Sequence, residues 1–136
     1  MDISVQKQNG VVFTPQWVAD FMVSEILKNQ KIIGNEKILD AGCGEGVFSA
    51  AAVRKFSELS GKPVERVIEE NIYFIDISPD YIKTTKKNLQ NLSKEKILRF
   101  NDILADFCFY NFSQKFDYII GNPPYVAQEE IEDPLG

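Results

Sequence analysis

The feature that most constrains the fold is a glycine-rich segment at 40–46 (Asp-Ala-Gly-Cys-Gly-Glu-Gly), which joins a short apolar stretch to a helix-like one. Glycines at alternate positions let the backbone turn sharply and approach a ligand without interference from side chains. Residues 37–40 before it have the composition of a buried strand. Residues 47–59 after it follow helical spacing and stop before Gly61 and Pro63. The segment predicts a strand–turn–helix unit with a ligand at the turn.

Strand-like and helix-like stretches alternate along the whole chain, which predicts an α/β fold with a parallel sheet and helices on both faces. Strands are expected at 37–40, 71–76, 97–100 and 116–121, and helices at 14–29, 47–59, 64–70 and 78–92, with a helical turn at 103–107. Thr14-Pro15 and Ser78-Pro79 each predict a helix start, because Ser and Thr cap helices and proline suits the first helical position. The expected strand order is 3-2-1-4, with ligands at the carboxyl ends of the strands.

Composition limits the chemistry that the chain can carry. It contains no histidine, the commonest general base and zinc ligand, and the spacing of Cys43 and Cys108 suggests no metal site. The net charge of −5 is unusual for a self-sufficient DNA-binding domain, so phosphate contacts are expected mostly from another domain or chain. We find no signal peptide and no membrane-spanning run, and expect a cytoplasmic protein without a membrane partner.

The glycine-rich segment favours a cationic ligand. Asp40 ends the first strand, and the spacing of Gly42, Gly44 and Gly46 lacks the third glycine position of the dinucleotide fingerprint. An aspartate at this place suits the ammonium and sulfonium of S-adenosylmethionine better than a pyrophosphate. The alternative is an ordinary strand-to-helix turn.

Acidic residues also follow the next two predicted strands. Asp76 can accept hydrogen bonds from both ribose hydroxyls of an adenosyl group, and Ile77 can pack on the adenine face. Asp76 alone is otherwise a capping or solvated aspartate. Asp102 can accept from the adenine amine, or can belong to an Asn-Asp turn. These positions predict a cofactor site along one edge of the sheet.

The fourth strand leads into Asn122-Pro123-Pro124-Tyr125. Prolines end the strand and stiffen the loop, so that backbone carbonyls keep fixed directions. The Asn122 amide and the Pro123 carbonyl can accept from one amino group and localise its lone pair, while Tyr125 offers a ring for stacking on a planar substrate. The alternative is a proline-rich turn with a structural aromatic residue.

Together these segments resemble the Rossmann-like amino methyltransferases, over about Gly10 to Tyr125. The stretch 10–22 resembles motif X of the gamma group of DNA adenine-N6 methyltransferases of restriction–modification type. This resemblance implies that Phe13, Thr14 and Pro15 hold the methionine end of S-adenosylmethionine, and that the loop with Pro124 is catalytic. Family members continue through further strands and a target-recognition domain, so we expect a single, truncated catalytic domain at 1–136.

Three functions stay open from the sequence. The leading one is methylation of adenine N6 in DNA, with DNA held through regions outside this chain. The second is glutamine-N5 methylation of release factors or RNA base methylation, with the same loop. A third is a non-catalytic cofactor-binding or assembly fragment that pairs with a second copy or a complementary chain through an exposed sheet edge.

Overall fold

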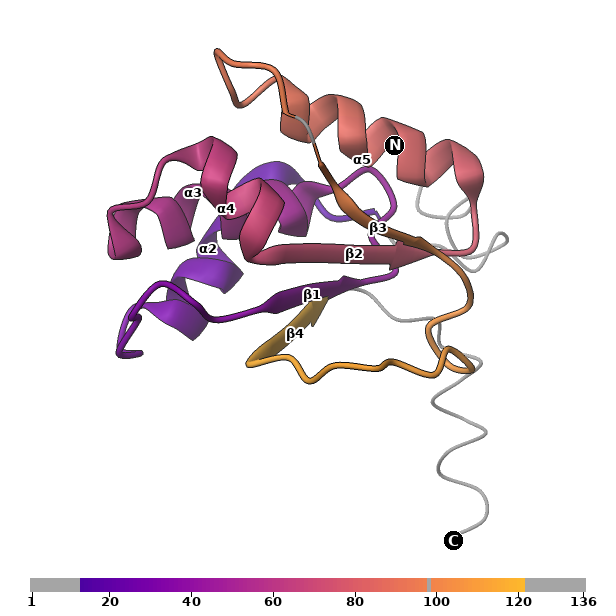
Figure 1. The fold of residues 1–136 in the computed structure, drawn as a ribbon, viewed down its shortest axis with the longest axis horizontal. Coiled ribbons are helices and arrows are strands. Elements are labelled where there is room, and N and C mark those ends of the chain that lie inside the picture. Colours follow the sequence, from indigo (N-terminus) through magenta and orange to yellow (C-terminus); the bar gives the residue numbers. More distant parts are fainter. Residues whose placement is uncertain (1–12, 98, 122–136) are drawn as a thin grey trace, which may run out of the picture.

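The computed structural model describes residues 13–97 and 99–121. Four parallel strands form one sheet in the order β3-β2-β1-β4 (Figure 1). The strands are β1 (Ile38–Ala41), β2 (Ile72–Asp76), β3 (Asn101–Leu104) and β4 (Tyr118–Gly121). The predicted parallel sheet and strand order are confirmed. All four carboxyl ends therefore meet at one edge, where the expected ligand site lies.

Four helices connect and cover these strands: α2 (Gln16–Leu27), α3 (Val47–Ser60), α4 (Val64–Glu70) and α5 (Pro79–Gln90). The predicted start of α5 is confirmed, because the Ser78 hydroxyl accepts from the Tyr81 amide and proline follows at the first helical position. The predicted end of α3 is also confirmed, with Gly61 in the left-handed region. None of the described helices is long and apolar enough to cross a membrane.

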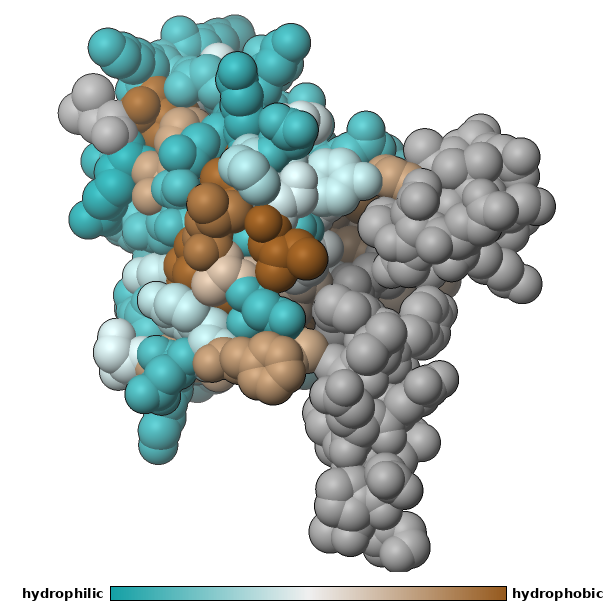
Figure 2. Space-filling model, turned by 90° about the vertical axis from the view of Figure 1, so that its right-hand side faces the viewer, coloured by the Kyte–Doolittle hydropathy of each residue, from teal (hydrophilic) through white to brown (hydrophobic). Residues whose placement is uncertain are grey.

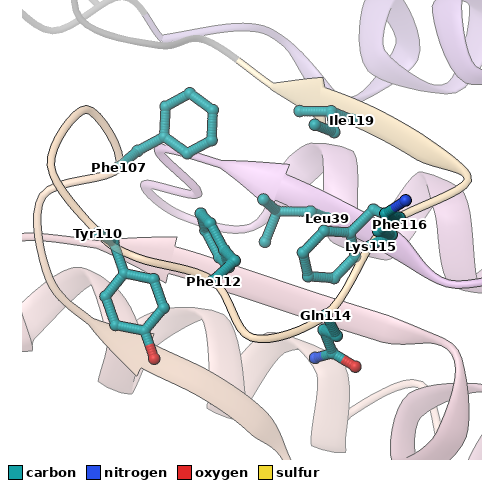
Figure 3. A pocket seen from close by; sticks show the side chains of 8 residues that line it. All are labelled: Leu39, Phe107, Tyr110, Phe112, Gln114, Lys115, Phe116 and Ile119. Carbon is teal, nitrogen blue, oxygen red and sulfur yellow. The ribbon is translucent and has the colours of Figure 1, made fainter.

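The described helices lie on one face of the sheet (Figure 1). Side chains along each strand point alternately to the two faces of the sheet. Those on the helix-covered face pack with the helices into one core that includes Ile72, Phe74 and Ile120. The segment 105–117 lies on the other face, and its aromatic side chains cover part of the sheet there (Figure 3). Helices on both faces were expected, and among the described residues they cover one.

A hollow of about 480 Å³ lies on this second face. It is open, mostly apolar, and built from β1, β4 and the segment between β3 and β4 (Figure 3). Its lining residues are Leu39, Phe107, Tyr110, Phe112, Gln114, Lys115, Phe116 and Ile119. The 105–117 segment thus packs its rings on one another and on the sheet where a doubly wound fold would place a helix.

Three element predictions were wrong. Helix α2 begins at Gln16, not at Thr14, because Pro15 keeps an extended backbone and serves as the N-cap, with its carbonyl accepting the first helical bonds. The third strand begins at Asn101, four residues later than predicted. Ile97 is not part of it, because its backbone N–H donates to the side-chain oxygen of Gln90 and its side chain is buried in the core. Pairing with β2 begins at Asn101, and the strand continues where a helical turn was expected.

Candidate functional site

The glycine-rich turn follows β1 at the carboxyl edge of the sheet. Gly42, Gly44 and Gly46 have φ values of 70°, 54° and 86°, in the left-handed region that favours glycine. The amides of Gly42 and Cys43 donate to the carbonyl of Ile75 in β2, at 2.9 and 3.0 Å. Because Gly46 is also the N-cap of α3, all three predicted glycines serve this turn.

Asp40 is fully buried under the turn, and only one of its two carboxylate oxygens accepts a hydrogen bond from the described residues. Its Oδ2 accepts from the Ser49 hydroxyl at 2.6 Å and from the Ser49 amide at 3.0 Å. Its Oδ1 has no donor among the described residues. Burial raises the pKa of Asp40 to about 7, with a contribution from the nearby Asp76 charge, against the lowering effect of Ser49. An unpaired buried carboxylate oxygen is the kind of group that a cationic ligand would satisfy.

Asp76 lies at the end of β2 and is tied to the turn. Its Oδ2 accepts from the Gly44 amide at 3.0 Å, and its Oδ1 accepts from the Ser78 amide at 3.0 Å. The carboxylate therefore joins the glycine-rich turn to the start of α5, and each oxygen keeps a further lone pair for a ligand. Ile77 beside it is 66% exposed, which leaves its side chain free to contact a ring.

Asp102 does not lie at the carboxyl edge of the sheet. It pairs in register with Phe74, two residues before the end of β2, and its carboxylate contacts Lys86 of α5 at 2.9 Å. Strand β3 continues to Leu104, which pairs with Asp76. The first carboxylate beyond the strand is Asp106, whose Oδ1 accepts from the Cys108 amide. Sequence reasoning missed Asp106 because it ended the strand too early.

The predicted N-terminal stretch reaches this edge through Phe13. Its ring meets the ring of Tyr81 in α5 edge to face, with centroids 6.3 Å apart. The side-chain amide of Gln16 donates to the carbonyl of Val47, the first residue after the glycine-rich turn, at 2.8 Å. Thr14 and Pro15 connect these two anchors, so the whole stretch lies beside the turn and the first residues of α5.

The carboxyl edge also carries apolar surface. Figure 2 looks onto this side and shows hydrophobic side chains gathered between hydrophilic ones and the grey residues. Ile77, Leu104 and Phe109 are each more than half exposed. Apolar side chains next to carboxylates suit a ligand with a flat ring and polar substituents.

The described chain ends at Gly121, where β4 pairs with Ala41 of β1. A Cβ atom on Gly121 would lie 2.6 Å from Oδ1 of Asp40 and 2.5 Å from the Ala41 carbonyl oxygen. The predicted catalytic residues Asn122, Pro123, Pro124 and Tyr125 lie outside the described residues. Within the described ranges, no three histidine, cysteine or acidic residues are grouped to hold a metal ion.

Comparison with known proteins gives consistent matches. The model of the family described as "Methyltransferase small domain" matches residues 17–136. The release factor glutamine methyltransferase of Bacillus anthracis is 26% identical over 125 residues, which cover 90% of this chain and 40% of that protein. The type II methyltransferase M.BstVI of Geobacillus stearothermophilus is 29% identical over 149 residues, covering 95% of this chain and 27% of that protein.

Among solved structures, an S-adenosylmethionine-dependent methyltransferase from Clostridium acetobutylicum is similar with a TM-score of 0.54 and 20% identity. The alignment covers 86% of this chain and 39% of that one. This chain spans about two fifths of the length of the first curated relatives that it matches.

Proposed function

The chain belongs to the methyltransferase small domain family, and on this premise we propose that it is the cofactor-binding and catalytic portion of an enzyme that methylates adenine N6 in DNA. Its fold is that of S-adenosylmethionine-dependent methyltransferases, and S-adenosylmethionine is the cofactor. The observation that carries the proposal is the gathering of Asp40, Asp76 and the glycine-rich turn at one sheet edge, with Phe13 beside them.

The residues present fit this cofactor. The unpaired Oδ1 of Asp40 offers a buried anionic acceptor for an ammonium group, and no basic side chain among the described residues pairs with it. Asp76 stands at the strand end with free acceptor capacity for ribose hydroxyls. We assign the ammonium to Asp40, the ribose to Asp76 and the adenine ring to the apolar surface at Ile77.

Asp106 is the better candidate for the adenine amine than Asp102. Asp106 comes two residues after Leu104, which pairs with Asp76 at the carboxyl end of the sheet. Asp102 comes two residues before Leu104 and is paired with Lys86. Asp106 can accept a hydrogen bond from the adenine amine directly, whereas Asp102 would first have to give up its ion pair with Lys86. We therefore move this role by one carboxylate along the chain.

The methyl-acceptor side of the site is proposed for residues 122–125. Bound S-adenosylmethionine supplies an activated methyl group, so the chain needs no side-chain base of high pKa. Asn122 and the Pro123 carbonyl would accept from the N6 amine and leave its lone pair directed at the methyl group, and Tyr125 would stack on the base. A base inside a duplex must first be flipped out to reach this loop.

The choice of DNA rests on the stretch 13–15. It resembles motif X of DNA adenine methyltransferases, and Phe13 lies against Tyr81 at the cofactor edge. The similarity to the type II methyltransferase M.BstVI extends over 95% of the chain and supports the same choice. DNA contacts would come mostly from other regions, in keeping with the acidic balance of these residues.

A second candidate is methylation of a glutamine N5 amide in a protein. It is favoured by the similarity to release factor glutamine methyltransferases. A planar carboxamide would offer its amino group to the loop in the same way as an adenine. RNA bases with exocyclic amines form a third acceptor class with the same geometry.

Methyl transfer from labelled S-adenosylmethionine to duplex DNA, RNA and a release factor separates these candidates. We expect label in DNA, recovered as N6-methyladenine after nuclease digestion. Label in the protein acceptor with none in DNA would replace the proposal with the glutamine-N5 activity. Cofactor binding without transfer to any acceptor would assign these residues a cofactor-binding role alone.

We also propose that a further polypeptide covers β4 and the aromatic hollow. No described strand pairs with the outer edge of β4, and Ile119 on it is 59% exposed. Parallel sheets are normally covered on both faces, so a second copy of this chain or a complementary chain would bury this surface.

A further inference from the structure

Two side chains of helix α5 donate hydrogen bonds to backbone carbonyls of the glycine-rich turn. The Oγ1 hydroxyl of Thr85 donates to the carbonyl oxygen of Gly44 at 2.9 Å. One turn further along the helix, the Nδ2 amide of Asn88 donates to the carbonyl oxygen of Glu45 at 2.8 Å. Two consecutive carbonyls of the turn are thus fixed by side chains three residues apart, which lie on the same side of a helix.

Thr85 is the buried member of this pair. Its side chain is inaccessible to solvent, and Oγ1 also lies 3.3 Å from the Cys43 sulfur. A Cβ atom on Gly46 would lie 2.9 Å from both Oγ1 and Cγ2 of Thr85. The threonine therefore fills the space under the turn and lies against it at three positions, Cys43, Gly44 and Gly46.

Gly44 is consequently held at both of its backbone groups. Its amide donates to Asp76, and its carbonyl accepts from Thr85. Asp76 in turn accepts from the amide of Ser78, the N-cap of α5. A glycine has little intrinsic preference between its allowed conformations, so these two bonds determine which one it keeps.

We infer that Thr85 is a positioning residue for cofactor binding, which acts by fixing the conformation of Gly44 and with it the hydrogen bond to Asp76. This inference rests on the proposed role of the turn and Asp76 in holding S-adenosylmethionine. Without the hydroxyl, the Gly44 carbonyl loses a buried donor and the turn gains alternative conformations. The cofactor would then bind only the fraction of molecules with the correct turn.

The test compares three variants of the whole chain. Thr85→Val removes the hydroxyl and keeps the shape, Thr85→Ser keeps the hydroxyl, and Thr84→Val makes the same change at the preceding, half-buried position. By calorimetry we expect Thr85→Val to weaken S-adenosylmethionine binding about 10-fold, the size of one lost buried hydrogen bond. Thr85→Ser and Thr84→Val should stay within about 2-fold of the wild-type Kd.

A second measurement needs no cofactor. We expect the Gly44 amide to exchange with solvent about 10-fold faster in Thr85→Val, and at the wild-type rate in the other two variants. If Thr85→Val lowers the free energy of unfolding but leaves the Kd and the Gly44 exchange unchanged, the residue is merely structural and the inference is wrong. Absence of binding by the wild-type chain would refute the proposed cofactor role, while Gly44 exchange would still decide whether Thr85 fixes the turn.

Discussion

The amide nitrogen of Gly44 lies 3.0 Å from Oδ2 of Asp76 and donates a hydrogen bond to it, across 32 positions of sequence. This bond joins the turn after β1 to the end of β2, and both were predicted separately as cofactor contacts. A charge-assisted hydrogen bond of this kind is stronger than a neutral one. The two parts of the site therefore depend on each other, and changes at Asp76 should alter both.

The first prediction concerns this carboxylate. We expect Asp76→Ala to raise the Kd for S-adenosylmethionine by about 10- to 100-fold, because a charged acceptor for the ribose is lost together with the bond to Gly44. Calorimetry measures the effect, and Asp80→Ala on the exposed side of α5 is the control. A variant that binds as tightly as the wild type would show that Asp76 is only a structural link.

The second prediction concerns Gly121. An alanine Cβ there would meet Asp40 and the Ala41 carbonyl at 2.6 Å or less, in a backbone with φ of 113°. We expect Gly121→Ala to lower the free energy of unfolding by about 3 kcal/mol or more. Gly34→Ala is the matched control, since its φ is 114° and its Cβ would meet only a Lys62 side-chain carbon at 3.7 Å, and it should cost about 1–2 kcal/mol. Equal losses in denaturant titrations would contradict the close packing at Gly121.

The third prediction concerns pH. The pKa of Asp40 is raised from 3.8 to about 7, so the folded chain keeps a proton that the unfolded chain releases between about pH 4 and 7. The corresponding stability is present below pH 4 and lost as the pH rises through about 7. Asp40→Asn has no carboxyl group to titrate here and should not show this loss. As the pH rises from 4 to 8, its free energy of unfolding should therefore increase relative to that of the wild type by on the order of 2–4 kcal/mol.

Denaturant titrations at several pH values measure this difference, with Asp80→Asn as a control for the change in net charge. Binding should show the opposite trend. An ammonium requires the ionised carboxylate, so affinity of the wild type for S-adenosylmethionine should increase from pH 6 to 8, and Asp40→Asn should lose that increase. A parallel pH profile for the variant and the wild type would contradict the assignment of Asp40.

The fourth prediction separates two carboxylates. Asp106→Asn should weaken S-adenosylmethionine binding by about 10-fold, because the amide keeps the bond to the Cys108 amide but loses the charge. Asp102→Asn removes the partly exposed ion pair with Lys86 and should cost less than about 1 kcal/mol in stability, with no change in Kd. The reverse order of the two Kd values would restore the role first expected for Asp102.

The fifth prediction concerns the exposed edge. Ile119→Lys places a charge on β4 and should weaken self-association by about 10-fold, measured by analytical ultracentrifugation across a range of concentrations. Ile33→Lys is the control, because Ile33 is 72% exposed and lies in the segment between α2 and β1. A wild-type chain that is monomeric at every concentration would exclude the second copy as the partner.

Local sequence signals predicted the elements that depend on neighbouring residues. Ser78 and Pro79 start α5 as their types require, and the glycine-rich turn lies where its spacing predicts. Thr14 failed as a cap, because Pro15 kept an extended backbone and took that position itself. The third strand was misplaced because the Ile97 side chain is buried by the end of α5, and a buried apolar residue in a loop has the same sequence signal as one in a strand.

Tertiary contacts account for what the sequence did not predict. Ser49 and Thr85 look like ordinary helical residues, and their bonds to Asp40 and Gly44 depend on how α3 and α5 pack. Asp106 became a candidate only when the register placed Leu104 opposite Asp76. Such residues cannot be found from spacing alone, since their partners are distant in the chain.

The pairing of β4 with β1 has a consequence for the order of folding. Lys37 and Asp117, which bond to each other where these strands begin, are 80 positions apart. Strands β1 and β2 and the helices between them can assemble from closer neighbours, whereas β4 must close a long loop first. We expect the part of the site that holds the cofactor to form early, and the strand that leads to Asn122 to join last.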